Sequence, residues 1–92
     1  MSARWLEKYC GDQREMVARI ISQVNERTNF LRLLHEGVKN NTLISPYKYH
    51  VNTMIQDDYL FWKEIVRQEL RGKVADVMIG YVRQRFNNYF FS

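Results

Sequence analysis

Apolar residues recur at helical spacing along most of this chain, and no segment alternates with the period of a β-strand. In the first long stretch, the apolar positions are Met16, Val17, Ile20, Ile21, Val24, Leu31 and Leu34, with Thr28 filling the gap. Steps of three and four residues place these side chains on one face of a helix. The sequence therefore predicts an all-α fold, a small bundle of about three main helices with a short N-terminal helical arm over residues 2–10.

Capping residues set the limits of the first predicted helix, over residues 13–36. Asp12 precedes it, and Glu15 follows at the spacing of a capping box. Gly37 can adopt the left-handed conformation that ends many helices, and Val38 could then fold back as the hydrophobic contact of such an end. We expect this helix to stop before Gly37.

Two further helices are predicted after a polar linker. Ser45-Pro46 suits a helix start, which predicts a second helix over 46–71. Asp57-Asp58 falls in its middle and could cap a fresh start, so we expect either one helix or a break near 56–58. Gly72 favours a boundary, and the apolar period that follows predicts a third helix over 73–90.

Length limits this chain to one modest hydrophobic core, because 92 residues make one small domain, here taken as 1–92. A deep, walled substrate cavity is disfavoured at this size. The single cysteine, Cys10, cannot form an intramolecular disulfide, and no Cys/His cluster is present for zinc. We therefore expect a reducing, cytoplasmic compartment. No apolar run is long enough for a membrane span, so no membrane partner is expected.

The motifs of familiar catalytic sites are missing from the sequence. It contains no Gly-rich phosphate loop, no nucleophile elbow and no His-Glu-x-x-His pattern. Asp57 and Asp58 are adjacent, but neighbours on a helix diverge by about 100° and cannot flank one substrate atom. We expect no catalytic residue, no metal, no cofactor and no small-molecule substrate.

The aromatic content points instead to a protein partner. Ten of the 13 aromatic residues lie after residue 46, and the chain ends in Tyr89-Phe90-Phe91-Ser92. A helical period that buries Phe86 and Phe90 directs Phe91 elsewhere, and a small bundle cannot bury every aromatic residue near Trp62. The partner-binding residues predicted on this ground are Tyr59, Trp62 and Phe91. The function expected is that of an adaptor or inhibitor of a larger protein, a class that includes phage- and virus-encoded modulators of host enzymes.

A nucleic-acid-binding role is the alternative. Fourteen Lys and Arg against ten Asp and Glu give a net charge of +4, with no basic tail. Lys63, Arg67 and Arg71 would form a ladder at four-residue spacing along one helix. The full set of candidate phosphate contacts is Lys63, Arg67, Arg71, Arg83 and Arg85. The simpler interpretation of the ladder is a solvated face with local ion pairs, and a homodimer is compatible with either function.

Overall fold

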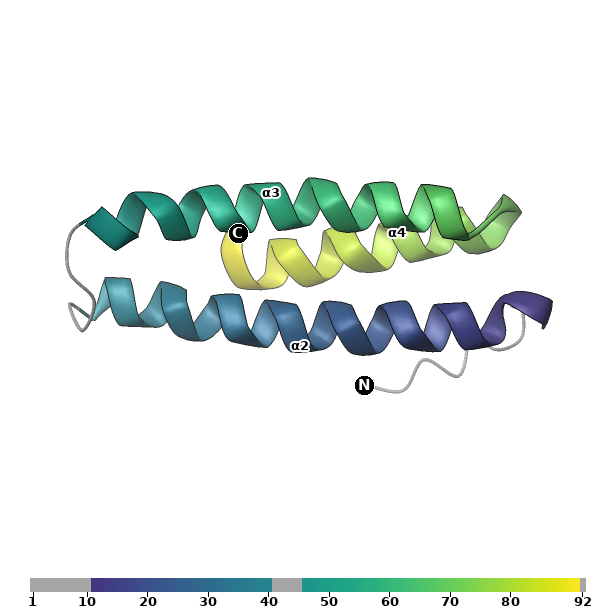
Figure 1. Ribbon diagram of the computed structural model, residues 1–92, viewed down its shortest axis with the longest axis horizontal. Helices are drawn as coiled ribbons and strands as arrows, with labels where there is room; N and C mark the ends of the chain where they lie inside the picture. Colours follow the sequence, from purple (N-terminus) through teal and green to yellow (C-terminus); the bar gives the residue numbers. More distant parts are fainter. Residues whose placement is uncertain (1–10, 41–45, 92) are drawn as a thin grey trace.

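Three long helices lie side by side in the computed structural model, which describes residues 11–40 and 46–91 (Figure 1). They are α2 (Arg14–Lys39), α3 (Pro46–Glu69) and α4 (Gly72–Phe86). A 3-10 turn, η1 (Gly11–Gln13), precedes α2, and a π-helical turn, η2 (Asn87–Phe91), follows α4. The described ranges contain no strand, which confirms the all-α fold class. The predicted arm over 2–10 lies outside the described residues.

The core is built from the predicted apolar faces. Each of α2, α3 and α4 contributes one stripe of buried apolar residues, and the three stripes pack together in one core. The largest fully buried side chains are Phe86, Ile20, Leu31, Met78, Val24, Val66, Val82 and Thr28. Thr28 is tolerated there because its hydroxyl donates a hydrogen bond of 2.7 Å to the Val24 carbonyl oxygen in the preceding turn.

The end of α2 differs from the prediction. Gly37 does not stop the helix, which continues to Lys39 and closes with the Asn40 N–H donating to the Glu36 carbonyl oxygen at 2.9 Å. A glycine inside a helix costs only about 1 kcal/mol relative to alanine. Val38 packs against the core when the helix continues, and this burial offsets that cost.

The start of α2 uses Asp12 and Gln13 for a different purpose from helix capping. No side-chain cap closes the helix N-terminus. The Asp12 carboxylate pairs with the Arg71 guanidinium, and the Gln13 Oε1 accepts a hydrogen bond of 2.9 Å from the Arg71 backbone N–H. The beginning of α2 is thereby tied to the connection between α3 and α4.

Helix α3 runs without a break through 56–58. Asp58 forms an ion pair with Arg27 of α2 rather than capping a new helix, and Asp57 is exposed. The helix ends at Glu69, two residues before the predicted limit. Gly72 then takes a φ of +65°, which favours glycine, and reverses the chain into α4.

The C-terminal turn changes the direction of the last aromatic side chains. We expected a regular helix to residue 90, but a π-helical turn begins at Asn87. Its hydrogen bonds span five residues, so side chains five positions apart share a side. Phe91 therefore returns to the side of Phe86, with 6.4 Å between the ring centroids and near-parallel planes. The expectation that Phe91 points away from Phe86 is wrong for this reason.

Candidate partner-binding surface

Exposed aromatic side chains occur on both α2 and α3, at or next to a depression that the two helices line. Phe30 is 46% exposed and Phe61 is 53% exposed. Trp62 is half-buried against the core and meets Phe61 edge to face, with 5.2 Å between ring centroids. Phe30 from α2 and Trp62 from α3 both line one shallow depression. We call Phe30, Phe61 and Trp62 the α2–α3 aromatic surface.

Polar groups frame this surface, and one ion pair joins its two helices. Arg27 of α2 pairs with Asp58 of α3, and its guanidinium carbon lies 5.2 Å from the centre of the Phe30 ring. Gln23 and Glu26 complete the lining of the depression. Aromatic residues and arginine within a polar frame are typical of the centres of protein–protein interfaces.

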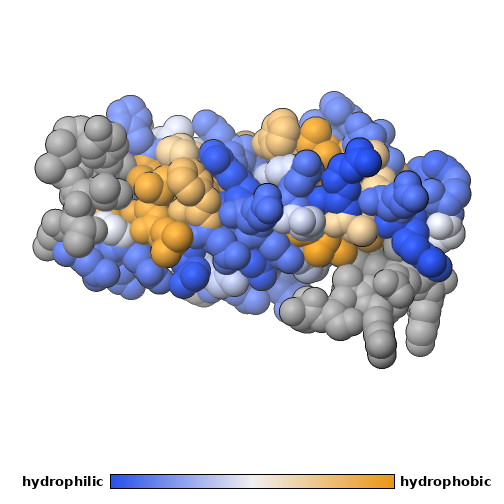
Figure 2. All heavy atoms as spheres, turned by 60° about the horizontal axis from the view of Figure 1, so that its bottom comes forward, coloured by the Kyte–Doolittle hydropathy of each residue, from blue (hydrophilic) through white to orange (hydrophobic). Residues whose placement is uncertain are grey.

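Hydrophobic residues elsewhere on the surface are interrupted by polar ones. On the face shown in Figure 2, they form separate groups among hydrophilic residues, the largest near the end of the bundle where α2 ends. Leu33 and Leu60 are also exposed. Exposed leucines are common on soluble proteins and do not mark a site by themselves.

Tyr59 and Phe91 belong to a second aromatic cluster at the C-terminal turn. Their ring centroids are 5.3 Å apart, and Tyr59 also lies 5.3 Å from Phe86. The Lys63 ammonium nitrogen lies over the Tyr59 ring, 4.5 Å from its centre. The structure thus brings together two of the three predicted partner-binding residues, whereas Trp62 lies over the depression that α2 lines.

Two members of the α2–α3 aromatic surface were not among the predicted residues. Phe30 does not fall at the helical spacing of the buried stripe that includes Thr28 and Leu31. The sequence alone therefore indicates that its side chain lies outside the core. Phe61 is about 100° from Trp62 around the helix, so one buried face of the helix cannot fully cover both side chains. Aromatic residues outside the core phase were therefore the useful indicator for both positions.

The five predicted phosphate contacts do not form one stripe. Lys63 and Arg67 share a face of α3, but Arg67 pairs with Glu64 at 3.9 Å and Arg71 lies beyond the helix end, paired with Asp12. Arg83 and Arg85 project about 200° apart around α4, because they are two positions apart.

A polar seam joins α4 to α2 on another side of the bundle. The Tyr81 hydroxyl donates to the Asn25 Oδ1 at 2.6 Å, and the Arg85 Nε donates to the Thr28 Oγ1 at 3.0 Å. Burial raises the pKa of Tyr81, while the nearby Arg85 charge and the hydrogen bond to Asn25 act to lower it. The seam accounts for the buried polar groups between these helices.

Residues 11–40 and 46–91 contain neither a candidate metal site nor a helix that could span a membrane. These residues hold no group of three or more His, Cys, Asp or Glu side chains placed to bind a metal ion. His35 contacts Phe90 edge to face at 5.9 Å. Within the same ranges, no helix combines the length and the apolar character needed to cross a membrane.

No protein family, curated protein or solved structure matches this chain.

Proposed function

We propose that this protein is a non-catalytic module that binds a larger protein through the α2–α3 aromatic surface, acting as an adaptor or as an inhibitor of that partner. The observation that carries the proposal is the exposure of Phe30 and Phe61 around the half-buried Trp62. Burying such side chains against a partner is favourable by about 25 cal/mol for each Å² of apolar surface removed from water.

The Arg27–Asp58 pair supports the same function. It crosses from α2 to α3 beside the aromatic side chains, so the surface is presented by two helices held at a fixed relative position. Pre-arranged aromatic anchors bind with a smaller loss of conformational entropy than a surface that must first become ordered. This property suits an adaptor or an inhibitor.

A nucleic-acid-binding role is the second candidate, with weaker support. Among the predicted phosphate contacts, Lys63 and Arg67 share a face of α3, and Arg67 already pairs with Glu64. Electrostatic binding to a phosphate backbone needs several such contacts acting together.

Capture of the partner from an extract of the source cell tests the proposed function. The bait is the full chain, compared with Phe61→Ser and with the matched control Leu60→Ser, which removes a neighbouring side chain that is 58% exposed. We expect one protein to be retained by the parent and the Leu60 variant after nuclease treatment, and reduced about tenfold by the Phe61 variant. Retention that disappears with nuclease would instead favour the nucleic-acid role.

A further inference from the structure

Arg85 stands apart from the other half-buried arginines of the described chain. Arg27 pairs with Asp58, and Arg32 pairs with Glu36 at 3.3 Å. Residues 11–40 and 46–91 provide no carboxylate partner for Arg85. Partial burial of a guanidinium costs free energy when no carboxylate pairs with it, and a bound anion would lower that cost.

The Arg85 side chain is nonetheless held in one place. Its Nε donates to the Thr28 hydroxyl at 3.0 Å, and its guanidinium carbon lies 4.8 Å from the centre of the Tyr89 ring. The Thr28 hydroxyl in turn donates to the backbone of its own helix. These contacts use the Nε–H and one face of the guanidinium, and they leave the four N–H groups of the terminal nitrogens for another acceptor.

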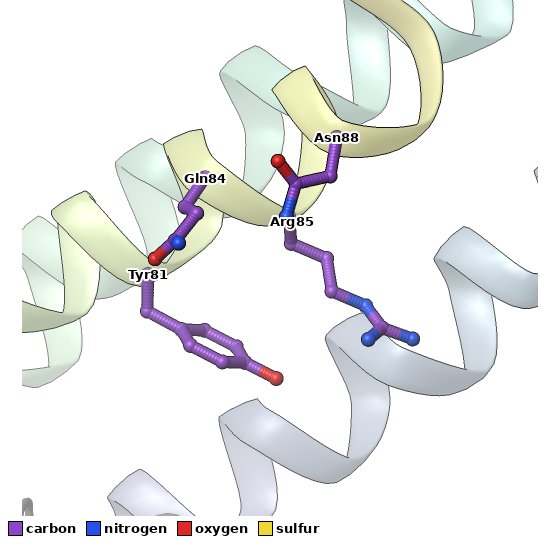
Figure 3. A pocket seen from close by; sticks show the side chains of 4 residues that line it. All are labelled: Tyr81, Gln84, Arg85 and Asn88. Atoms are coloured by element: carbon purple, nitrogen blue, oxygen red, sulfur yellow. The ribbon is translucent and has the colours of Figure 1, made fainter. Parts of the chain in front are cut away.

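Arg85 also lines a small hollow of about 100 Å³, together with Tyr81, Gln84 and Asn88. In Figure 3, the Tyr81 and Arg85 side chains extend from α4 toward α2, and the amides of Gln84 and Asn88 lie closer to the α4 backbone. This volume holds a few water molecules, and hence a small oxyanion. The lining supplies a guanidinium, two amides and a phenol, and no carboxylate.

A second guanidinium lies near this seam, and it already has a carboxylate partner in Glu36. Arg32 of α2 lies 5.9 Å from the centre of the same Tyr89 ring that Arg85 contacts. Glu36 compensates the charge of Arg32, whereas no carboxylate of residues 11–40 and 46–91 compensates that of Arg85.

We propose that the hollow beside Arg85 binds a phosphate group, with the guanidinium donating in a two-pronged arrangement and the Gln84 and Asn88 amides donating from α4. A planar guanidinium matches the spacing of two phosphate oxygens and is the side chain best suited to this contact. The site is separate from the α2–α3 aromatic surface and does not depend on the proposed function.

Nuclear magnetic resonance on the full chain tests the phosphate site. Inorganic phosphate is titrated while the arginine Nε–H signals are recorded, with chloride at matched ionic strength as the reference and phenyl phosphate in a second arm. We expect a saturable shift of the Arg85 signal with phosphate and none with chloride. Saturation by inorganic phosphate alone assigns the hollow to the free anion, and saturation by phenyl phosphate as well assigns it to esters.

Matched variants separate a built site from general attraction to a basic protein. Arg83→Gln removes the same charge from an exposed position two residues away and should leave the affinity unchanged. Arg85→Lys keeps the charge but loses the planar fork, and its binding is followed through the side-chain amide signals of Gln84 and Asn88. Asn88→Ala removes one amide at an exposed position and is followed through the Arg85 signal. Each should weaken phosphate binding about tenfold or less, and Arg85→Lys more than Asn88→Ala. Equal losses in the Arg83 and Asn88 variants, or equal shifts with chloride and phosphate, would overturn the proposal.

Discussion

Tyr59 of α3 packs edge-on against Phe91 of the C-terminal turn, with 5.3 Å between ring centroids and 71° between ring planes. The contact ties the last residues of the described chain to the middle of α3. It exists because the π-helical turn brings Phe91 back beside Phe86. Phe91 still leaves 37% of its surface exposed, so it is both a packing residue and an accessible one.

Substitution of Phe91 should therefore affect stability, and by less than substitution of a core aromatic. Phe91→Ser is expected to lower the free energy of unfolding by about 1–2 kcal/mol, since it loses two ring contacts and half-buried surface. Phe86→Ala, at a fully buried ring, should cost about 3–5 kcal/mol. Urea unfolding measures both. Equal costs for the two variants would show that Phe91 is a core residue, and no cost at all would show that the packing on Tyr59 is not formed.

The two described glycines of α4 provide a paired test of backbone conformation. Gly72 has a φ of +65°, whereas Gly80 lies inside the helix, and a Cβ at either position meets no neighbouring atom within 4 Å. Gly72→Ala should destabilise by about 1 kcal/mol because alanine is strained in that conformation. Gly80→Ala should stabilise by about 0.5–1 kcal/mol because alanine favours helix. Thermal melting reports the sign of each change, and the same sign for both would contradict the chain reversal at Gly72.

Alkaline pH should weaken the fold through Tyr81. Burial raises the pKa of this phenol above its ordinary value of 10.0, so near and above that pH the unfolded chain loses the proton more readily than the folded chain. Stability from this group is fully present below pH 10 and is lost as pH rises through the folded-state pKa. We expect the free energy of unfolding to fall less steeply above pH 10 in Tyr81→Phe than in the parent, as measured by urea unfolding at pH 7, 9 and 10.5. Identical slopes would refute a raised Tyr81 pKa.

The Arg27–Asp58 pair should couple α2 to α3 by a modest energy. Both side chains remain partly exposed, so screening by water limits the interaction. A double-mutant cycle with Arg27→Gln and Asp58→Asn should give a coupling of about 0.5–1 kcal/mol, reduced at high salt. A coupling of zero would mean that the pair does not fix the register of the two helices.

Periodicity alone predicted the fold class and the buried stripe of α2, because tertiary packing of an apolar face decides where a helix lies. Local signals at helix ends were less reliable. Gly37 was expected to end α2, but the packing of Val38 outweighs the propensity of one glycine. Asp12 was expected to cap α2, but the helix connection at Arg71, 59 positions along the chain, recruits its carboxylate instead.

The candidate site could be predicted only in part, for a similar reason. The exposure near Trp62 could be predicted because Phe61 and Trp62 are adjacent and cannot both lie on the buried face of one helix. The position of Phe91 depends on a π-helical turn, for which the sequence Asn87-Asn88-Tyr89 carries no local rule that we know. Two parts of the separation of the five basic residues are local, because Arg67 pairs with Glu64 three positions before it and Arg83 and Arg85 diverge around one helix. Only the pairing of Arg71 with Asp12 is a tertiary property that the sequence could not show.

Site-specific photo-crosslinking tests most directly whether the α2–α3 aromatic surface contacts a partner protein. The photoreactive amino acid p-benzoylphenylalanine replaces Phe61 in one variant and Leu60 in the other, since these neighbours are similarly exposed but project about 100° apart on α3. After irradiation in nuclease-treated extract of the source cell, we expect one covalent adduct with a protein from position 61 and none from position 60. An adduct of equal yield from both positions, or from position 60 alone, would contradict a partner-binding role for this surface.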